Sequence, residues 1–215
     1  MPAVIALLDY GAGNVRSVHK ALIAAGGDVQ LASTPDKVML ADAVVLPGVG
    51  AFDDCINAMQ RQELLEATRG FIASGKPFLG VCVGYQALFE KSEEFGSHSG
   101  LGIIKGSVRK FQFYAGENTK SPVPQIGWNK IRQNGSKWNE TPLCKNRDND
   151  FMYFVHSYYV EPDNKQVILS TTTYGDREYC SAIQYNNIFA TQFHPEKSGS
   201  IGMKIYQQLK IDLDK

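Results

Sequence analysis

The first half of the chain alternates short apolar runs with segments whose apolar residues recur at helical spacing. The apolar runs predict buried strands at Val4–Tyr10, Val29–Ala32, Ala43–Leu46 and Phe78–Val81. The helical spacing predicts helices at Asn14–Ala25, from Thr34 onward, at Phe52–Ser74 with room for one break, and at Gly84–Phe89. Because strands alternate with helices, we expect a parallel sheet covered by helices on both faces.

The second half has a different pattern, in which strands follow one another through turns. These strands are expected at Leu101–Phe113, Gln125–Arg132, Phe151–Glu161, Val167–Thr173, Ala182–Tyr185 and Ile188–Phe193. Polar surface loops are expected at Gln112–Val123 and Asn134–Asn149, and a closing helix at Ile201–Leu209. No repeat or linker divides the chain. We therefore expect a single α/β domain, residues 1–215, with an open, mostly parallel sheet flanked by helices and additional antiparallel strands in the C-terminal half.

Composition and charge exclude several classes of partner. The 215 residues include 22 Lys and Arg and 22 Asp and Glu, so the formal net charge is zero. Nucleic-acid binders usually carry a basic excess, and anionic membranes attract basic segments, so we expect neither partner. No apolar run approaches the roughly 18 residues of a membrane-spanning helix. No basic segment precedes the first apolar stretch, so we expect no signal peptide and a cytoplasmic protein.

The four cysteines lie at Cys55, Cys82, Cys144 and Cys180. No two of them form a CxxC pair, so a zinc site is not expected, and neither is any other metal or cofactor. In a reducing compartment an isolated cysteine is either a small buried apolar residue or a nucleophile.

The segment Gly80–Gln86, with the sequence GVCVGYQ, favours a nucleophile at Cys82. Small residues two before and two after Cys82 permit a sharp strand-to-helix turn that pushes the thiol outward, as in a nucleophile elbow. The helix N-terminus would favour the thiolate, and the N–H of Val83 would supply half of an oxyanion hole. The alternative is a buried structural cysteine between helix-packing glycines.

The segment FHPE at 193–196 offers a base for this nucleophile. His194 directly follows an expected strand, at the edge where the sites of parallel α/β sheets form. A cysteine nucleophile needs a base, and the base needs an orienting carboxylate, which Glu196 would supply. The alternative is a surface turn with an exposed His and Glu. The competing histidines fit less well. His19 is expected in a helix, His98 in a polar loop and His156 in the middle of a strand.

Two glycine-rich turns follow other strands. Pro47-Gly48-Val49-Gly50 could bring backbone N–H groups close to a ligand and complete the oxyanion hole, or it could be an ordinary turn. Gly11-Ala12-Gly13-Asn14 matches only the start of a dinucleotide fingerprint, because Arg16 stands where a third glycine is needed. A tight strand-to-helix turn is the simpler interpretation there.

Together, GVCVGYQ, PGVG and FHPE resemble the motifs of the class I, triad-type glutamine amidotransferases, from residue 4 to about residue 209. Within this class the chain is similar to the family of glutaminase subunits of imidazole glycerol phosphate synthases. That similarity rests on DYGAGN at 9–14, PGVGAF at 47–52, GWN at 127–129, YFVHSY at 153–158 and HPEKS at 194–198. Gln125, where the family pattern has His, and the longer Asn134–Asn149 loop depart from it.

The resemblance implies a mechanism. Cys82 would attack the side-chain amide carbon of glutamine, while His194, oriented by Glu196, moves the proton to the leaving ammonia; water then hydrolyses the thioester to glutamate. It also implies three further sets of residues: oxyanion-hole residues Val49, Gly50 and Val83; substrate contacts Gln86, Glu94, His156 and Ser157; and partner-facing residues Asn14, Tyr153 and Lys197. The oxyanion loop would align only when the partner binds its own ligand.

The partner that the resemblance implies is a (β/α)8 cyclase subunit, forming a heterodimer with this chain. It would receive ammonia through an internal tunnel and make imidazole glycerol phosphate and aminoimidazole carboxamide ribotide in histidine biosynthesis. Three alternatives stay open. They are a glutaminase that serves another synthase, a stand-alone cysteine hydrolase active without any partner, and a non-catalytic binding module with an unreactive Cys82.

Overall fold

The computed structural model describes residues 2–112, 121–135 and 138–215. Its central sheet has a parallel part that is formed by β1 (Val4–Leu8), β2 (Asp28–Ala32), β3 (Ala43–Leu46), β4 (Phe78–Val81) and β14 (Ile188–Thr191). The strand order is β2-β1-β3-β4-β14. Every residue of β3, β4 and β14 is buried, as parallel strands covered on both faces require.

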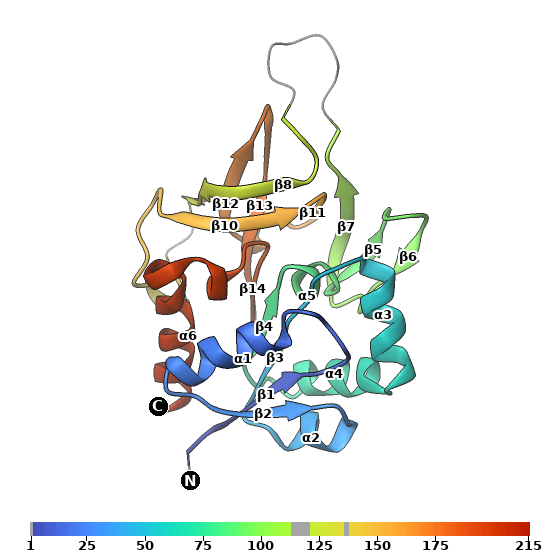
Figure 1. Cartoon of the computed structure of the whole chain (residues 1–215), viewed down its shortest axis with the longest axis vertical. Helices are drawn as coiled ribbons and strands as arrows, with labels where there is room; N and C mark the ends of the chain where they lie inside the picture. The colour runs from blue at the N-terminus through green and yellow to red at the C-terminus, as the bar shows by residue number, and fades with distance from the viewer. Residues whose placement is uncertain (1, 113–120, 136–137) are drawn as a thin grey trace.

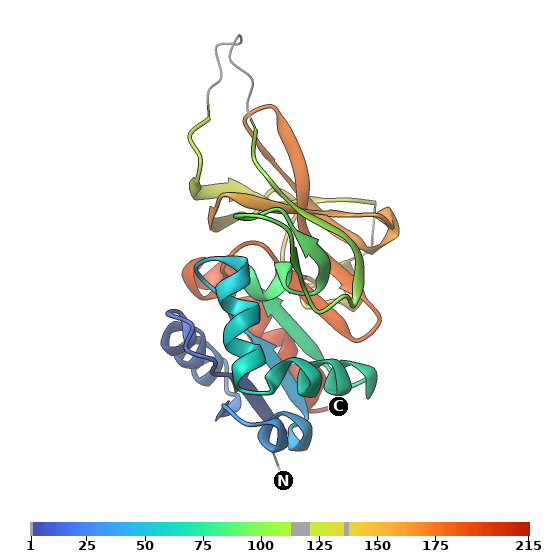
Figure 2. The same cartoon turned by 90° about the vertical axis from the view of Figure 1, so that its right-hand side faces the viewer.

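Helices pack against both faces of these strands. They are α1 (Val15–Ala24), α2 (Pro35–Leu40), α3 (Phe52–Arg61), α4 (Leu64–Ala73) and α6 (Gly199–Leu213). Figure 2 shows α3 and α4 in front of the parallel strands and α6 behind them. The expected break within 52–74 lies between α3 and α4, where Glu63 adopts a left-handed φ of 59° that a continuous helix cannot contain.

The antiparallel part of the sheet extends from β14 away from the helices (Figure 1). Its strands are β13 (Arg177–Tyr185), β11 (Tyr158–Pro162), β7 (Ile104–Lys110), β5 (Phe89–Ser92), β6 (His98–Ser99), β12 (Ile168–Tyr174) and β9 (Arg132–Gln133). Within it, only β5 and β7 run parallel among the described residues. A separate pair, β8 (Gln125–Lys130) and β10 (Phe151–His156), lies beside it. The predicted α/β class, with antiparallel strands in the C-terminal half, is confirmed.

Two expected elements are wrong. The strand predicted at Phe151–Glu161 is divided at Ser157, because β10 pairs with β8 while β11 pairs with β7 and β13 in the main sheet. The helix predicted at Gly84–Phe89 ends early: α5 spans only Val83–Gln86, and Phe89 already begins β5. The N–H groups of Leu101 and Ile103 donate to the carbonyls of residues 87 and 88, so tertiary pairing replaces further helical turns.

The long polar segment Asn134–Asn149 is more ordered than the predicted loop. It contains a 3-10 turn, η1 (Trp138–Glu140), and the indole N–H of buried Trp138 donates to the carbonyl of Leu169 at 2.9 Å. Residues 136–137 of this segment, and residues 113–120 of the other predicted loop, lie outside the described residues. Further short turns occur at η2 (Lys165–Val167) and η3 (Pro195–Lys197). No helix in the described ranges is long and apolar enough to cross a membrane.

Candidate active site

Cys82 occupies a strained turn between β4 and α5. Its φ of 55° and ψ of −108° are sparsely populated for a residue with a side chain. The turn is tight: a Cβ on Gly84 would lie 2.1 Å from the carbonyl oxygen of Leu46, and one on Gly80 would lie 2.9 Å from the carbonyl oxygen of residue 84. Both glycines are therefore required for the elbow that the sequence predicts. Because α5 is a single turn, its helix dipole contributes less to thiolate stability than the sequence suggested.

His194 and Glu196 form a fully buried pair behind this turn. Nδ1 of His194 lies 2.7 Å from Oε1 of Glu196, and neither side chain is exposed to solvent. The carboxylate also accepts hydrogen bonds of 3.4 Å from Nδ2 of Asn14 and from the hydroxyl of Tyr206. The exposed surface turn considered for these residues is therefore wrong. Pro195 begins the short turn η3, which places the two side chains on the same side.

Neighbouring charges favour the imidazolium that forms when His194 takes the proton of Cys82. Burial alone would lower the pKa of His194, but the Cys82 sulfur and the Glu196 carboxylate raise it to about 10. Burial would raise the pKa of Glu196, but the hydrogen bond and charge of His194 lower it overall. Nε2 of His194 is buried and has no hydrogen-bond partner among the described residues. An imidazole that is held at Nδ1 and open at Nε2 is arranged to exchange a proton with the neighbouring thiol.

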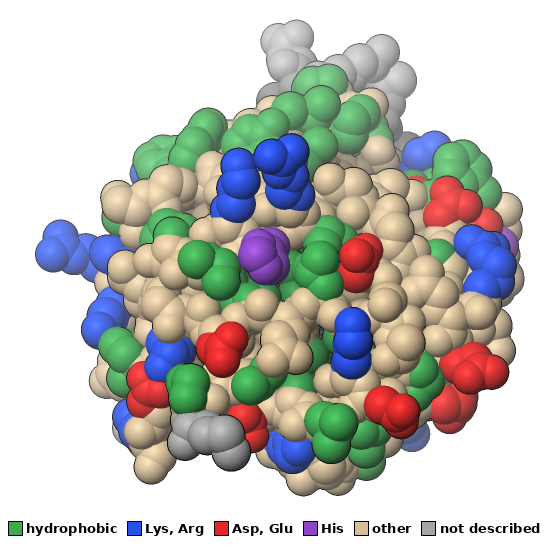
Figure 3. Space-filling model, turned by 60° about the horizontal axis from the view of Figure 1, so that its bottom comes forward, with side chains coloured by type: hydrophobic (Ala, Val, Ile, Leu, Met, Phe, Trp, Pro, Cys, Tyr) green, Lys and Arg blue, Asp and Glu red, His purple; other side chains and the backbone are tan. Residues whose placement is uncertain are grey.

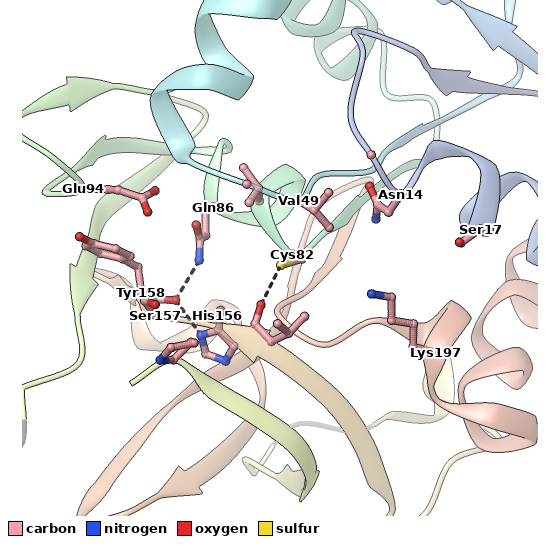
Figure 4. Close-up of a pocket in the computed structure, with 15 residues that line it drawn as sticks. Asn14, Ser17, Val49, Cys82, Gln86, Glu94, His156, Ser157, Tyr158 and Lys197 are labelled. Atoms are coloured by element: carbon pink, nitrogen blue, oxygen red, sulfur yellow. Dashed lines mark hydrogen bonds between the residues drawn. The ribbon is translucent and has the colours of Figure 1, made fainter. Parts of the chain in front are cut away.

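Cys82 faces a pocket of about 520 Å³ (Figure 4). The labelled lining residues lie in two groups: Gln86, Glu94 and Tyr158 on one side of Cys82, and Asn14, Ser17 and Lys197 on the other. The sulfur lies 4.0 Å from the carbonyl oxygen of Val155. The pocket therefore reaches from the nucleophile in two directions, which suits a small substrate on one side and an exit on the other.

The loop Pro47–Gly50 runs along this pocket, which Val49 and Gly50 line. The N–H of Val83, expected as an oxyanion donor, donates to the carbonyl of Gly48 at 3.4 Å. One predicted donor is thus occupied in this conformation. The preceding carbonyl, that of Pro47, accepts a 2.7 Å hydrogen bond from the buried hydroxyl of Tyr10.

The expected substrate contacts also surround the pocket. Oε2 of Glu94 accepts a 2.7 Å hydrogen bond from the N–H of Phe52 at the start of α3. Burial raises the pKa of Glu94, an effect that this hydrogen bond opposes. Nε2 of Gln86 donates to the carbonyl of Tyr158 at 2.9 Å and to Oε1 of Gln192 at 3.1 Å, so only the side-chain oxygen of Gln86 remains for a ligand. Ser157, at the division between β10 and β11, lines the pocket directly.

His156 lines the pocket, but its ring is held by the protein. Nδ1 lies 2.8 Å from the carbonyl oxygen of Tyr158 and Nε2 lies 3.2 Å from the hydroxyl of Tyr179. Burial lowers its pKa to about 3, so the ring is neutral at physiological pH. Both ring nitrogens of His156 therefore lie against groups of the protein, which leaves the backbone as the part of this residue that can contact a ligand.

The three residues expected to face a partner have different environments. The ammonium of Lys197 lies over the ring of Tyr153, 5.8 Å from its centroid. Asn14 is only 4% exposed, and its amide is bound to Glu196. A partner could therefore contact Tyr153 and Lys197, whereas Asn14 connects the pocket to the buried pair.

The model of the class-I glutamine amidotransferase family matches residues 6–211. The chain belongs to this family. Relatives align with nearly the whole chain. The amidotransferase is 41% identical over 206 residues to imidazole glycerol phosphate synthase subunit HisH 1 of Legionella pneumophila, and this alignment covers 95% of this chain and 97% of the relative. It is 45% identical to subunit HisH of Gloeothece citriformis, covering 94% and 93%.

Solved structures show the same fold at low identity. The amidotransferase superimposes on PurLQS from Thermotoga maritima with a TM-score of 0.75 and 16% identity, covering 100% of both chains. It superimposes on the glutaminase domain of CTPS from Trypanosoma brucei with a TM-score of 0.65 and 15% identity, covering 99% and 94%. At this level of identity, the likeness supports only the fold of the amidotransferase.

Two side chains of the amidotransferase that contact the candidate nucleophile or the buried pair were not predicted from the sequence. They are Tyr206, which binds Glu196, and Gln192, whose amide lies 3.7 Å from the Cys82 sulfur. The departure at Gln125 has a structural explanation: this fully buried side chain accepts from Tyr179 and donates to Asn129, both at 2.9 Å. Within the described residues, no group of three or more metal-binding side chains comes together.

Proposed function

We propose that this chain is the glutaminase subunit of an imidazole glycerol phosphate synthase. The observation that carries the proposal is the strained elbow at Cys82 with the buried His194–Glu196 pair behind it. Relatives 41–45% identical over 94–95% of the chain carry the name of that subunit. The proposal assigns Cys82 as nucleophile, His194 as base and Glu196 as the group that orients it.

The reaction follows from this arrangement. The Cys82 thiol loses its proton to Nε2 of His194, and the sulfur attacks the amide carbon of glutamine. His194 returns the proton to the leaving nitrogen, so that ammonia departs and a γ-glutamyl thioester remains. Water, deprotonated by the same imidazole, cleaves the thioester to glutamate and restores the thiol. Glu196 stabilises the imidazolium in both half-reactions and keeps Nε2 directed at the sulfur.

The oxyanion hole forms by rotation of a single peptide unit. The carbonyl of Gly48 and the N–H of Val49 belong to the same peptide, and that carbonyl occupies the N–H of Val83. Rotation of this peptide releases the Val83 N–H and turns the Val49 N–H toward the pocket, which supplies two donors at once. Glycines on both sides of Val49, one with a φ of 100°, lower the cost of the rotation. A partner can thus control the rate through this loop.

The side of the pocket that holds Gln86 and Glu94 suits the α-amino group of glutamine. Gln86 has only its oxygen available, and Glu94 offers a carboxylate fixed by the N-terminus of α3. The backbone at His156 and Ser157 then lies near the substrate carboxylate. Ammonia leaves on the opposite side, past Asn14 and Lys197 (Figure 4).

The outer face of β8 and β10 is suited to a protein partner. Ile126, Trp128 and Phe151 are 62%, 52% and 49% exposed. Trp128 pairs across the strands with Tyr153, and Ile126 pairs with Val155, which lines the pocket. This apolar face is therefore continuous with the site where ammonia forms. Figure 3 shows acidic and basic side chains interspersed on one face of the molecule, with hydrophobic side chains along its upper edge.

The partner on this face is a (β/α)8 cyclase, which takes up the ammonia in a heterodimer. Ammonia released into water at neutral pH is mostly protonated and no longer nucleophilic, so a covered path preserves its reactivity. The cyclase joins it to a phosphoribulosyl-formimino aminoimidazole carboxamide nucleotide, which yields imidazole glycerol phosphate and releases aminoimidazole carboxamide ribotide. The four free cysteines are consistent with a reducing, cytoplasmic location.

Cys82→Ala and Cys82→Ser, each in complex with the cyclase, test this function. Glutamine-dependent synthesis should fall to background, while synthesis from added ammonium salt should continue, because the cyclase site is unchanged. Glutamine hydrolysis by the Cys82→Ala complex would overturn the assignment. Strong hydrolysis by the wild-type chain alone, unaffected by the cyclase and its ligand, would favour a stand-alone hydrolase.

A further inference from the structure

Gln192 lies immediately after β14, beside the elbow, and its side chain is fully buried. A buried amide must find hydrogen-bond partners or destabilise the fold. Oε1 of Gln192 accepts from Nε2 of Gln86 at 3.1 Å, and Nε2 of Gln192 lies 3.7 Å from Sγ of Cys82, within hydrogen-bonding distance for sulfur. The backbone N–H of Gln192 donates to the carbonyl of Ser181 at 2.9 Å, which fixes the base of the side chain.

The orientation of both amides follows from one fixed acceptor. The carbonyl of Tyr158 can only accept, so the nitrogen of Gln86 must face it, at 2.9 Å. The same nitrogen faces Gln192, which must therefore present its oxygen. The nitrogen of Gln192 is then left facing Cys82. Exchanging nitrogen and oxygen in either amide would place two donors or two acceptors against each other.

We propose that Gln192 is a further catalytic residue, which donates an N–H to the Cys82 sulfur and stabilises the thiolate formed when His194 takes the proton. The inference rests on the proposed function. A hydrogen bond to an ionised acceptor is stronger than one to the neutral group, so the donor favours the reactive form of Cys82. Gln86 holds this donor in place from the substrate side of the pocket.

Other groups near Cys82 do not replace this donor. The titratable side chains around it are His194, His156, Tyr10 and Tyr179, with Glu94 and Lys197 farther along the pocket wall. Burial raises the pKa of both tyrosines and lowers that of His156, so these three side chains remain neutral between about pH 5 and pH 9. The Val155 carbonyl near the sulfur accepts from the thiol and cannot stabilise a thiolate. Among the described residues, Gln192 is the uncharged side chain whose N–H is directed at the Cys82 sulfur in this conformation.

Two substitutions separate this role from packing. Gln192→Glu keeps an oxygen for Gln86 but removes the N–H that faces Cys82, whereas Gln192→Met removes both polar atoms at similar length. Gln208→Met makes the same chemical change in α6, outside the pocket. The measurement is the second-order rate of alkylation of Cys82 by iodoacetamide from about pH 5 to pH 10, followed on the Cys82 peptide by mass spectrometry in the full chain.

At neutral pH, Gln192→Glu and Gln192→Met should alkylate Cys82 about tenfold more slowly, because a hydrogen bond to a charged group contributes on the order of 1.5 kcal/mol or more. Their pH profiles should move to higher pH, while Gln208→Met should match the wild type. Wild-type profiles for both Gln192 variants would overturn the inference. So would a slower rate in the Met variant alone, since that would show a packing role. Neither result touches the proposed function, which fails separately if Cys82→Ala retains glutaminase activity.

Discussion

The hydrogen bond from Tyr10 to the carbonyl of Pro47 gives a sharp test of how the glycine-rich loop is held. The bond is 2.7 Å long and buried, and Tyr10 is only 6% exposed. Tyr10→Phe removes the hydroxyl and leaves the carbonyl without this donor, at a cost of about 1–3 kcal/mol. For a chain of this size, that cost lowers the Tm by roughly 2–12 °C.

A matched control exists on the surface. The hydroxyl of Tyr174 donates to the carbonyl of Pro122 at 2.6 Å, the same kind of bond in an exposed position. Tyr174→Phe should therefore change the free energy of unfolding by no more than about 0.5 kcal/mol. Urea unfolding of both variants and the wild type provides the comparison. Equal losses in the two variants, or no loss in Tyr10→Phe, would refute the idea that burial makes the Tyr10 bond important.

Three further substitutions test other parts of the structure. Gly84→Ala places a methyl group 2.1 Å from the carbonyl oxygen of Leu46, so we expect a loss of more than about 3 kcal/mol by thermal unfolding; a wild-type Tm would contradict the elbow geometry. Burial lowers the pKa of His156 in the folded chain to about 3, against about 6.5 in the unfolded chain. The contribution of neutral His156 to the free energy of unfolding is therefore fully present above about pH 6.5. It is lost as the pH falls toward 3, by up to about 1.4 kcal/mol per pH unit. In urea unfolding at several pH values, His156→Gln should flatten this decline, and an unchanged slope would disprove it. Trp128→Ala should weaken binding of the proposed cyclase partner by about tenfold or more in titration calorimetry, and an unchanged Kd would remove β8 from the proposed interface.

Much of the site could be predicted from local sequence, because its parts are short motifs at strand ends. Gly80 and Gly84 predict the elbow, and the backbone atoms packed against them leave no room for a larger residue at either position. His194 and Glu196 are two residues apart, and Pro195 narrows the backbone between them, so their pairing could also be predicted. Each of these contacts is set by a few neighbouring residues.

The remaining features depend on contacts between distant segments. Gln192 meets Cys82 across 110 positions, and Asn14 meets Glu196 across 182, so no spacing rule could reveal either. The division of the predicted 151–161 strand at Ser157 likewise depends on which sheet each half joins. Burial of His194 and Glu196 could not be predicted either, because a His-Pro-Glu sequence is equally compatible with an exposed turn.

The central claim is that Cys82 forms a covalent intermediate with glutamine, and this intermediate can be trapped. The wild-type chain, in complex with the proposed cyclase partner and that partner's ligand, is mixed with glutamine, quenched in acid during turnover, digested, and analysed by mass spectrometry. We expect a γ-glutamyl adduct on the peptide that contains Cys82, absent in Cys82→Ala and absent without glutamine. Turnover without an adduct on that peptide, or with the adduct on Cys55, Cys144 or Cys180 instead, would contradict the claim.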